Sequence, residues 1–201
     1  SFHVTGVQTC ALPIFPGTLW RVDSNGLGNR NTTHGVSRAW YGASIPDFRQ
    51  TEPEQVIGCL LKNSDFAVLP TQRDAWLVQL ELLRQSLDGV VGSLFLEFSI
   101  PRMGRRIDAV LIVGPVVLAV EFKVGEATFD RAAIEQTWDY ALDLKNFHEA
   151  SHAVSIVPVL IATEADSQAP AQLLADADHV YRPVRIGSDG LRAVIELGSS
   201  H

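Results

Sequence analysis

The chain has 201 residues, enough for one domain of ordinary size or one domain with a small appendage. Its hydrophobic content of 46% supports a core, and 19% charged residues exclude a largely disordered chain. The formal net charge of -7 excludes a general attraction to nucleic acid, so phosphate binding would need a local basic patch.

The cysteines and the apolar runs bear on the compartment. Cys10 and Cys59 show no spacing typical of a metal site or a disulfide, which suits a reducing compartment. No apolar run approaches the roughly 18 residues that a membrane span needs. We therefore expect a cytoplasmic protein with no membrane partner.

The first part of the chain differs in character from the rest. Residues 4–14, VTGVQTCALPI, resemble the translation of a common sequencing-library adapter, as left by assembly of metagenomic DNA. Residues 15–37 are rich in Gly, Asn, Thr and Ser and show neither helical nor strand periodicity. We expect residues 1–38 to be an artefactual or disordered leader rather than a signal peptide. Residues 39–201 would then form the folded domain.

Two helices are predicted at the start of this domain. Thr51 and Glu54 fit a capping box and predict a helix that ends near residue 63. A second helix is predicted from residue 69 or 71 to residue 87, because its apolar residues recur at intervals of three and four. This apolar stripe consists of Trp76, Leu77, Leu80, Leu83 and Leu87.

Strands dominate the middle of the domain. Residues 105–123, RRIDAVLIVGPVVLAVEFK, contain two apolar runs that predict a β-hairpin turning at the central Gly-Pro pair. A strand over residues 93–100 precedes the hairpin, and a helix over residues 132–147 follows it. Residues 156–162, IVPVLIA, predict a strand that is buried on both faces.

The last part of the chain predicts a small helix near residues 169–175 and strands over residues 179–186 and 191–197. The domain therefore reads as helix, three strands, helix and strand, with small additions at both ends. This order indicates an α/β fold.

Three charged residues stand in the otherwise apolar hairpin: Asp108, Glu121 and Lys123. Glu121 and Lys123 are two residues apart and point the same way, and the hairpin brings Asp108 opposite them. Charges in apolar surroundings are costly unless they are paired or bind a metal. Two carboxylates can hold Mg²⁺ or Mn²⁺ while the ammonium orients a water, which suits phosphodiester hydrolysis. The alternative is a salt bridge at the strand ends between Lys123 and a carboxylate.

The spacing of these three residues, on the second and third strands of the predicted order, resembles the PD-(D/E)xK nuclease superfamily. Ile107 stands where the superfamily's motif has proline, and the metal-binding carboxylate Asp108 is retained. The resemblance implies a restriction-endonuclease-like core. It also implies that Asp108 and Glu121 hold Mg²⁺ or Mn²⁺ and that Lys123 positions the attacking water.

Further residues of the candidate site come from the same resemblance. Gln136 and Tyr140 are similar to the Q-x-x-x-Y element of RecB-like members, and a spacing of four puts both on one helix face. Tyr140 also belongs to the apolar stripe of its helix, so the alternative is a core aromatic. The resemblance suggests Glu81, on the helix before the sheet, as an additional metal ligand or as a group that orients the metal site. The alternative for Glu81 is a solvated helix charge.

A local basic patch precedes Asp108. Arg102, Arg105 and Arg106 are candidates for binding the substrate phosphate, and the alternative is an ordinary solvated turn.

A more specific resemblance covers residues 39–165. The segments FSIPRMGRRIDAVLIVG, VEFKVGE and QTWDYALDLKNFHEASH resemble the N-terminal region of bacterial proteins that carry a Schlafen-group-3-like DNA/RNA helicase domain. No G-x-x-x-x-G-K-[ST] motif occurs in the chain, so the resemblance implies a fragment, a nuclease module separated from its C-terminal helicase. It would act on nucleic acid, on DNA more readily than on RNA. A second hypothesis is a nucleic-acid-binding or regulatory module of that helicase without catalytic activity.

One rival motif points to different chemistry. His148, Glu149 and His152 match H-E-x-x-H, which on a helix places two imidazoles on one face for zinc, as in zinc peptidases. The motif falls at the predicted end of a helix, with no clear third ligand after it. The alternative is a pair of histidines favourably placed at the negative end of the helix dipole.

Overall fold

The structure is a computed structural model, and it describes residues 38–64, 67–100, 104–148, 151–176 and 178–199. The predicted leader up to residue 37, as well as Arg102 and Glu149, lie outside the described residues.

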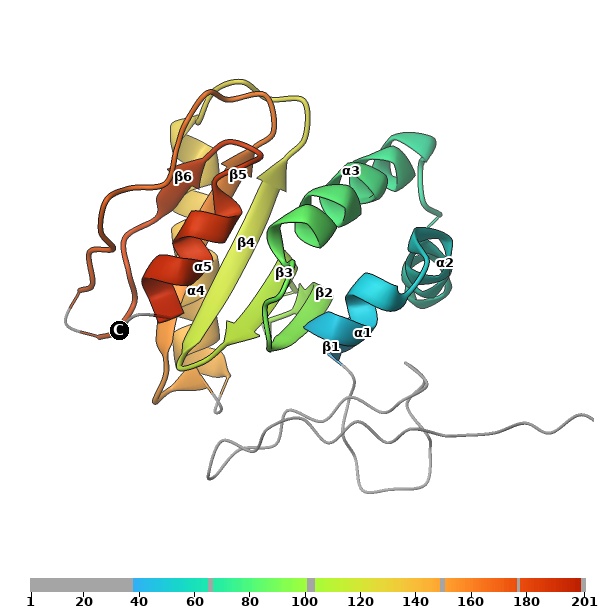
Figure 1. Ribbon diagram of the computed structural model, residues 1–201. Helices are drawn as coiled ribbons and strands as arrows, with labels where there is room; N and C mark the ends of the chain where they lie inside the picture. The colour runs from blue at the N-terminus through green and yellow to red at the C-terminus, as the bar shows by residue number, and fades with distance from the viewer. Residues whose placement is uncertain (1–37, 65–66, 101–103, 149–150, 177, 200–201) are drawn as a thin grey trace, which may run out of the picture.

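A six-stranded sheet forms the centre of the molecule, with its strands in chain order (Figure 1). The strands are β1 Tyr41–Ser44, β2 Ser93–Ser99, β3 Arg106–Val113, β4 Val116–Lys123, β5 Ser155–Ala162 and β6 Val184–Ile186. Neighbours from β1 to β4 are antiparallel, whereas β4 pairs with β5 and β5 with β6 in parallel. The sheet is therefore mixed.

Helices cover both faces of this sheet. They are α1 Ile45–Gln50, α2 Pro53–Asn63, α3 Pro70–Ser86, α4 Arg131–Phe147 and α5 Leu191–Ser199. One apolar core joins α1, α2, α3 and α5 to one face of the sheet, and a second core joins α4 to the other face. In Figure 1, α5 lies in front of the sheet and α4 behind it. The prediction of an α/β fold is confirmed at this level.

The central hairpin agrees with its prediction. Val113 pairs with Val116 across the turn, and Gly114 has the positive φ of 55° that a two-residue hairpin turn needs. Side chains along β4 alternate between the two cores, with Val120 in the first and Ala119 in the second. Helix α4 then connects β4 to β5, as a parallel pair requires.

The predicted capping box at Thr51 is wrong. Thr51 ends α1, and its hydroxyl donates a hydrogen bond of 2.8 Å to the Asp47 carbonyl. Glu52 is the N-cap of α2 and makes no capping hydrogen bond with its side chain. The side-chain cap is found one helix earlier, where Ser44 accepts a hydrogen bond of 3.1 Å from the Asp47 amide. Both β1 and α1 were absent from the sequence prediction.

Two predictions for the last part of the chain are also wrong. Residues 169–175 are not helical, because this segment bonds to its neighbour: the Arg182 amide donates to the Leu174 carbonyl. The predicted strand over 191–197 is helix α5. The alternation of apolar residues in this segment also fits a strand. The buried side chains nevertheless recur at the helical spacing of three and four residues: Leu191, Val194, Ile195 and Gly198. The strand predicted over 179–186 is reduced to β6.

None of the helices in the described ranges combines the length and the apolar character that a membrane span requires. The cytoplasmic location stays a prediction.

Candidate functional site

The two strands of the central hairpin separate next to Asp108. Their backbone pairing is continuous up to Ala109 and Val120, so Asp108 is the next residue of β3 beyond the ladder. Its Oδ2 accepts a hydrogen bond of 2.9 Å from the backbone amide of Phe122. A side-chain carboxylate thus takes the place of a strand carbonyl, which ties Asp108 to the end of β4 that carries Glu121 and Lys123.

A chain of hydrogen bonds runs from β4 to α4. The Lys123 ammonium donates to Glu121 Oε1 at 3.1 Å and to Gln136 Oε1 at 3.3 Å. The Gln136 amide in turn donates to the Tyr140 hydroxyl at 2.6 Å. The structure therefore brings together four of the predicted site residues, and Asp108 lies beside them. Lys123 forms the salt bridge that was the alternative reading, but Gln136 shares it.

Glu121 is only partly satisfied by this chain. It is 6% exposed, and its Oε2 is buried without a hydrogen-bond partner among the described residues. Burial raises the pKa of Glu121, while the charge of Lys123 and its hydrogen bond oppose that rise. A buried carboxylate oxygen with no donor is in position to accept a cation or a proton.

Burial and the Glu121 charge raise the pKa of Asp108 well above its usual range, and the hydrogen bond from Phe122 lowers it. The charges of Glu121 and Asp108 also raise the pKa of Tyr140, after burial as the main cause. These three groups therefore share one electrostatic environment. A cation between the carboxylates would relieve their mutual repulsion.

Glu97 on β2, which was not among the predicted site residues, supplies a third carboxylate near Asp108 and Glu121. Leu96 pairs with Ala109 and Phe98 with Ile107, so Glu97 on β2 lies across from Asp108. Glu97 has a φ of 51°, in the left-handed region that a non-glycine residue rarely adopts inside a strand. Such a backbone costs on the order of 1–3 kcal/mol and is typical of functional sites.

Glu97 is held at both oxygens and is 7% exposed. The Trp76 indole donates to Oε1 at 2.8 Å, and the Arg106 guanidinium donates to Oε2 at 3.1 Å. Arg106 also lies over the ring of Trp40, 4.2 Å from its centroid. The sequence signal was a lone glutamate in the apolar run SLFLEFSI. The charge of Glu97 contributes to the raised pKa of both Asp108 and Glu121.

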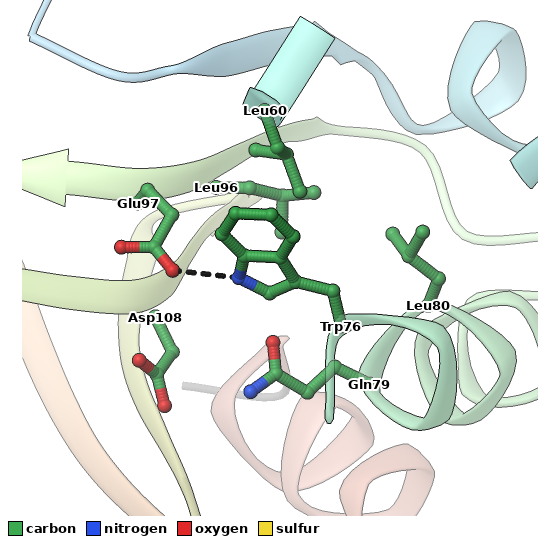
Figure 2. A pocket seen from close by; sticks show the side chains of 7 residues that line it. All are labelled: Leu60, Trp76, Gln79, Leu80, Leu96, Glu97 and Asp108. Atoms are coloured by element: carbon green, nitrogen blue, oxygen red, sulfur yellow. Dashed lines mark hydrogen bonds between the residues drawn. The ribbon is translucent and has the colours of Figure 1, made fainter. Parts of the chain in front are cut away.

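A small pocket opens between α3 and the sheet beside these carboxylates. Its lining residues are Leu60, Trp76, Gln79, Leu80, Leu96, Glu97 and Asp108. Figure 2 shows the Gln79 amide and the carboxylates of Glu97 and Asp108 pointing into the same space. Helix α3 supplies Trp76 and Gln79 from one face, since they lie one turn apart.

Other predicted residues lie elsewhere. Glu81 is on the exposed face of α3, where it accepts a hydrogen bond of 2.7 Å from Gln85, so it does not join the carboxylates. Arg105 forms ion pairs with Asp139 at 3.7 Å and Asp143 at 3.9 Å on α4. Since Arg106 is bonded to Glu97, Arg105 and Arg106 do not form the free basic patch predicted for phosphate.

No protein-family model, curated protein or solved structure matches this chain. Within the described ranges, no three His, Cys, Asp or Glu side chains are grouped so that they could hold one metal ion. A cation here would be held by Asp108 and Glu121, with water as the source of its other oxygens.

The described residues of the H-E-x-x-H motif lie beyond the end of the α-helix that would have to carry both histidines. Helix α4 ends at Phe147, and His148 is its C-cap, with Nδ1 2.9 Å from Ser151 Oγ. His152 Nε2 lies 3.3 Å from the Asn146 carbonyl oxygen. Burial, then the charges of Arg38 and His152, lower the pKa of His148 to about 4. The lowered pKa favours the neutral ring of His148, so it gives no support to the alternative in which the histidines are favourably placed at the negative end of the helix dipole.

Proposed function

We propose that the chain is a nuclease module that hydrolyses phosphodiester bonds of nucleic acid with the help of Mg²⁺ or Mn²⁺. The observation that carries this proposal is the hydrogen-bonded chain from Glu121 through Lys123 and Gln136 to Tyr140, with Asp108 beside it. A salt bridge alone would not need a helix amide and a phenol aligned behind the ammonium.

The order of elements supports a restriction-endonuclease-like core for this module. Helix α3, the meander of β2, β3 and β4, helix α4 and strand β5 follow one another as the resemblance implies. On this reading β1, α1 and α2 are the N-terminal addition and β6 with α5 the C-terminal one.

The residues present fit a hard divalent cation. Glu121 Oε2 is buried and has no hydrogen-bond partner among the described residues, and Asp108 carries a second carboxylate next to it. When bound, the cation supplies charge neutralisation at the phosphate and lowers the pKa of a bound water. Both carboxylates would be its protein ligands.

Among the described residues, the Lys123 ammonium has two hydrogen-bond acceptors, which leaves it a third N–H to donate. Glu121 and Gln136 fix the ammonium, so its remaining proton can orient a water or a phosphate oxygen. Tyr140 holds Gln136 in place by accepting from its amide, which makes Tyr140 a positioning residue. The side chains of this chain thus orient the reactants and stabilise negative charge.

The substrate class follows from the same charges. Carboxylates around a cation suit phosphodiesters, whereas the net charge of -7 gives little affinity for a nucleic acid in the absence of a cation. We propose DNA as the preferred substrate and a helicase domain as the covalent partner in the full protein. The alternative is a binding or regulatory module that keeps this fold without cleavage.

The test uses the full 201-residue chain with single-stranded and double-stranded DNA and RNA, in Mg²⁺ or Mn²⁺. We expect cleavage that needs the cation and that falls at least about 100-fold in Asp108→Asn and in Lys123→Gln. The matched controls are Glu135→Gln and Lys62→Gln, which remove exposed charges on α4 and α2. Cleavage that survives Asp108→Asn would refute the site, and folded protein that binds DNA without cutting it would favour the alternative.

A further inference from the structure

Arg105 directly precedes β3, and its backbone is held more firmly than its side chain. The Ile100 amide donates a hydrogen bond of 2.9 Å to the Arg105 carbonyl. The guanidinium forms ion pairs with Asp139 at 3.7 Å and Asp143 at 3.9 Å, and both distances are longer than a hydrogen bond. No residue in the described ranges accepts a hydrogen bond from this guanidinium, and the side chain is 47% exposed. Its N–H donors are therefore available to a ligand.

Asp143 is an unfavourable partner for a purely structural ion pair. Its side chain is 15% exposed, and its Oδ2 is buried without a hydrogen-bond donor in the described part of the chain. Burial raises the pKa of Asp143, and the charge of Arg105 opposes that rise. A buried carboxylate oxygen without a donor lowers stability, whereas an ion pair with an exposed arginine contributes little. Stability alone therefore does not account for this pair.

One face of α4 connects the ion pair with the candidate site. Gln136, Tyr140 and Asp143 follow one another at spacings of four and three residues, so they share that face. Burial raises the pKa of Tyr140, and the charge of Arg105 is among the causes that lower it. The guanidinium therefore lies within electrostatic reach of the hydrogen-bonded chain that ends at Tyr140. A phosphate bound by Arg105 would lie at the edge of the site.

We propose that Arg105 binds a phosphate of the nucleic acid backbone at this edge, and that Asp139 and Asp143 neutralise its guanidinium in the free protein. A phosphodiester offers two oxygens that a guanidinium can bind at hydrogen-bond distance, which the two carboxylates do not. Binding exchanges two long ion pairs for one bidentate contact. The aspartates thus compete with the substrate and lower its affinity. This inference rests on the proposed function, since it concerns how the same site binds its substrate.

The test measures binding of the full-length chain to a fluorescein-labelled DNA duplex by fluorescence anisotropy. Ca²⁺ replaces Mg²⁺ as a hard cation of the same charge, and a gel checks that the DNA stays intact. We expect Asp143→Asn to lower the dissociation constant about 3- to 5-fold, because an amide does not neutralise Arg105. Arg105→Gln should raise the dissociation constant. Added to Arg105→Gln, the Asp143→Asn substitution should have no effect, because the guanidinium that it releases is gone.

Glu135→Gln is the matched control, because it removes a carboxylate from the same helix, where Glu135 pairs with Arg131 at 2.7 Å. It makes the same change in net charge but leaves Arg105 neutralised, so it should change the affinity much less. Adding Arg105→Gln to Asp143→Asn should reduce the slope of log affinity against log salt by about 0.9, as for one lost phosphate contact. An equal gain from Glu135→Gln, or a gain from Asp143→Asn that persists without the Arg105 guanidinium, would refute the inference.

Asp139→Asn, at a side chain that is 58% exposed, is the second variant should Asp143→Asn not fold, and it should change the affinity in the same direction. The outcomes separate this inference from the proposed function. The expected binding pattern without cleavage in Mg²⁺ or Mn²⁺ would support the phosphate contact and contradict the nuclease. Cleavage by a protein whose variants bind DNA as the wild type does would refute the role of Arg105 and leave the nuclease standing. Failure of every variant and of the wild type to bind DNA would overturn both.

Discussion

The indole of Trp76 on α3 donates a hydrogen bond of 2.8 Å to Glu97 on β2, and both side chains are buried. This bond joins the helical layer to the strand whose backbone is left-handed at Glu97. It fixes the Glu97 carboxylate, whose charge contributes to the raised pKa of Asp108. Loss of the indole donor should therefore lower the free energy of unfolding of the domain.

Trp76→Phe removes the indole N–H and keeps an aromatic ring in the core. Because Glu97 Oε1 would lose its donor, we expect the free energy of unfolding to fall by about 1–3 kcal/mol, measured by urea denaturation. Trp138→Phe, at a side chain that is 36% exposed on α4, should change it by less than about 0.5 kcal/mol. Equal effects from the two substitutions would contradict the importance of the bond.

Arg106 and Glu97 should show strong coupling. Arg106→Met leaves a buried carboxylate without its charge partner, and we expect a loss of about 1–3 kcal/mol. In the presence of Glu97→Gln the same substitution should cost much less, because no uncompensated charge remains. A double-mutant cycle by urea denaturation measures this coupling. Additive effects would show that the pair does not interact, and Arg105→Met is the control on an exposed ion pair.

The Asp108 and Glu121 carboxyl groups should each contribute more to the stability of the metal-free protein as the pH falls from about 7 to about 5. Asp108 and Glu121 have raised pKa values in the folded state, so the folded protein binds more protons than the unfolded chain in this range. Asp108→Asn should remove much of this dependence, and saturating Mn²⁺ should oppose it by favouring the ionised carboxylates. Urea midpoints at the two pH values measure it. Because His148 acts in the opposite direction in this range, the readout is the difference between the wild type and Asp108→Asn. An Asp108→Asn protein whose stability changes between pH 7 and pH 5 by as much as that of the wild type would contradict the prediction.

His148 should contribute with the opposite sign. Its pKa falls to about 4 in the folded protein, against about 6.5 in an unfolded chain. Its contribution to stability is therefore present above pH 6.5 and is lost as the pH falls toward 4. An NMR titration of the imidazole should give a midpoint near 4 in the folded protein and near 6.5 in urea. A folded midpoint near 6.5 would show that the ring is not buried as the structure has it.

The sequence predicted the charged residues of the hairpin because strand periodicity alone places them. Glu121 and Lys123 point the same way on β4, and the spacing of Gln136 and Tyr140 puts them on one helix face. Their convergence needed only that α4 pack beside β4. These are short-range rules that a single sequence obeys.

Glu97, Gln79 and Glu81 could not be assigned in that way. The position of the Glu97 side chain depends on the positive φ of Glu97, which breaks the alternation of side chains along β2. The local sequence does not predict such a φ for a glutamate. Gln79 and Glu81 lie two residues apart on α3, so which one faces the sheet depends on how the helix is rotated about its axis. The structure turns Gln79 inward and Glu81 to solvent.

Helix α4 connects β4 to β5 and supplies Gln136 to the site, so the site forms in two steps during folding. The β3–β4 hairpin closes through a two-residue turn, so the separation in sequence between Asp108 and Glu121 is small and their encounter is fast. Gln136 reaches Lys123 only when α4 docks as the crossover to β5, which is a slower, non-local event. During synthesis Asp108 and Glu121 would therefore come together before Gln136 fixes Lys123. The docking of α4 would then complete the hydrogen-bonded site.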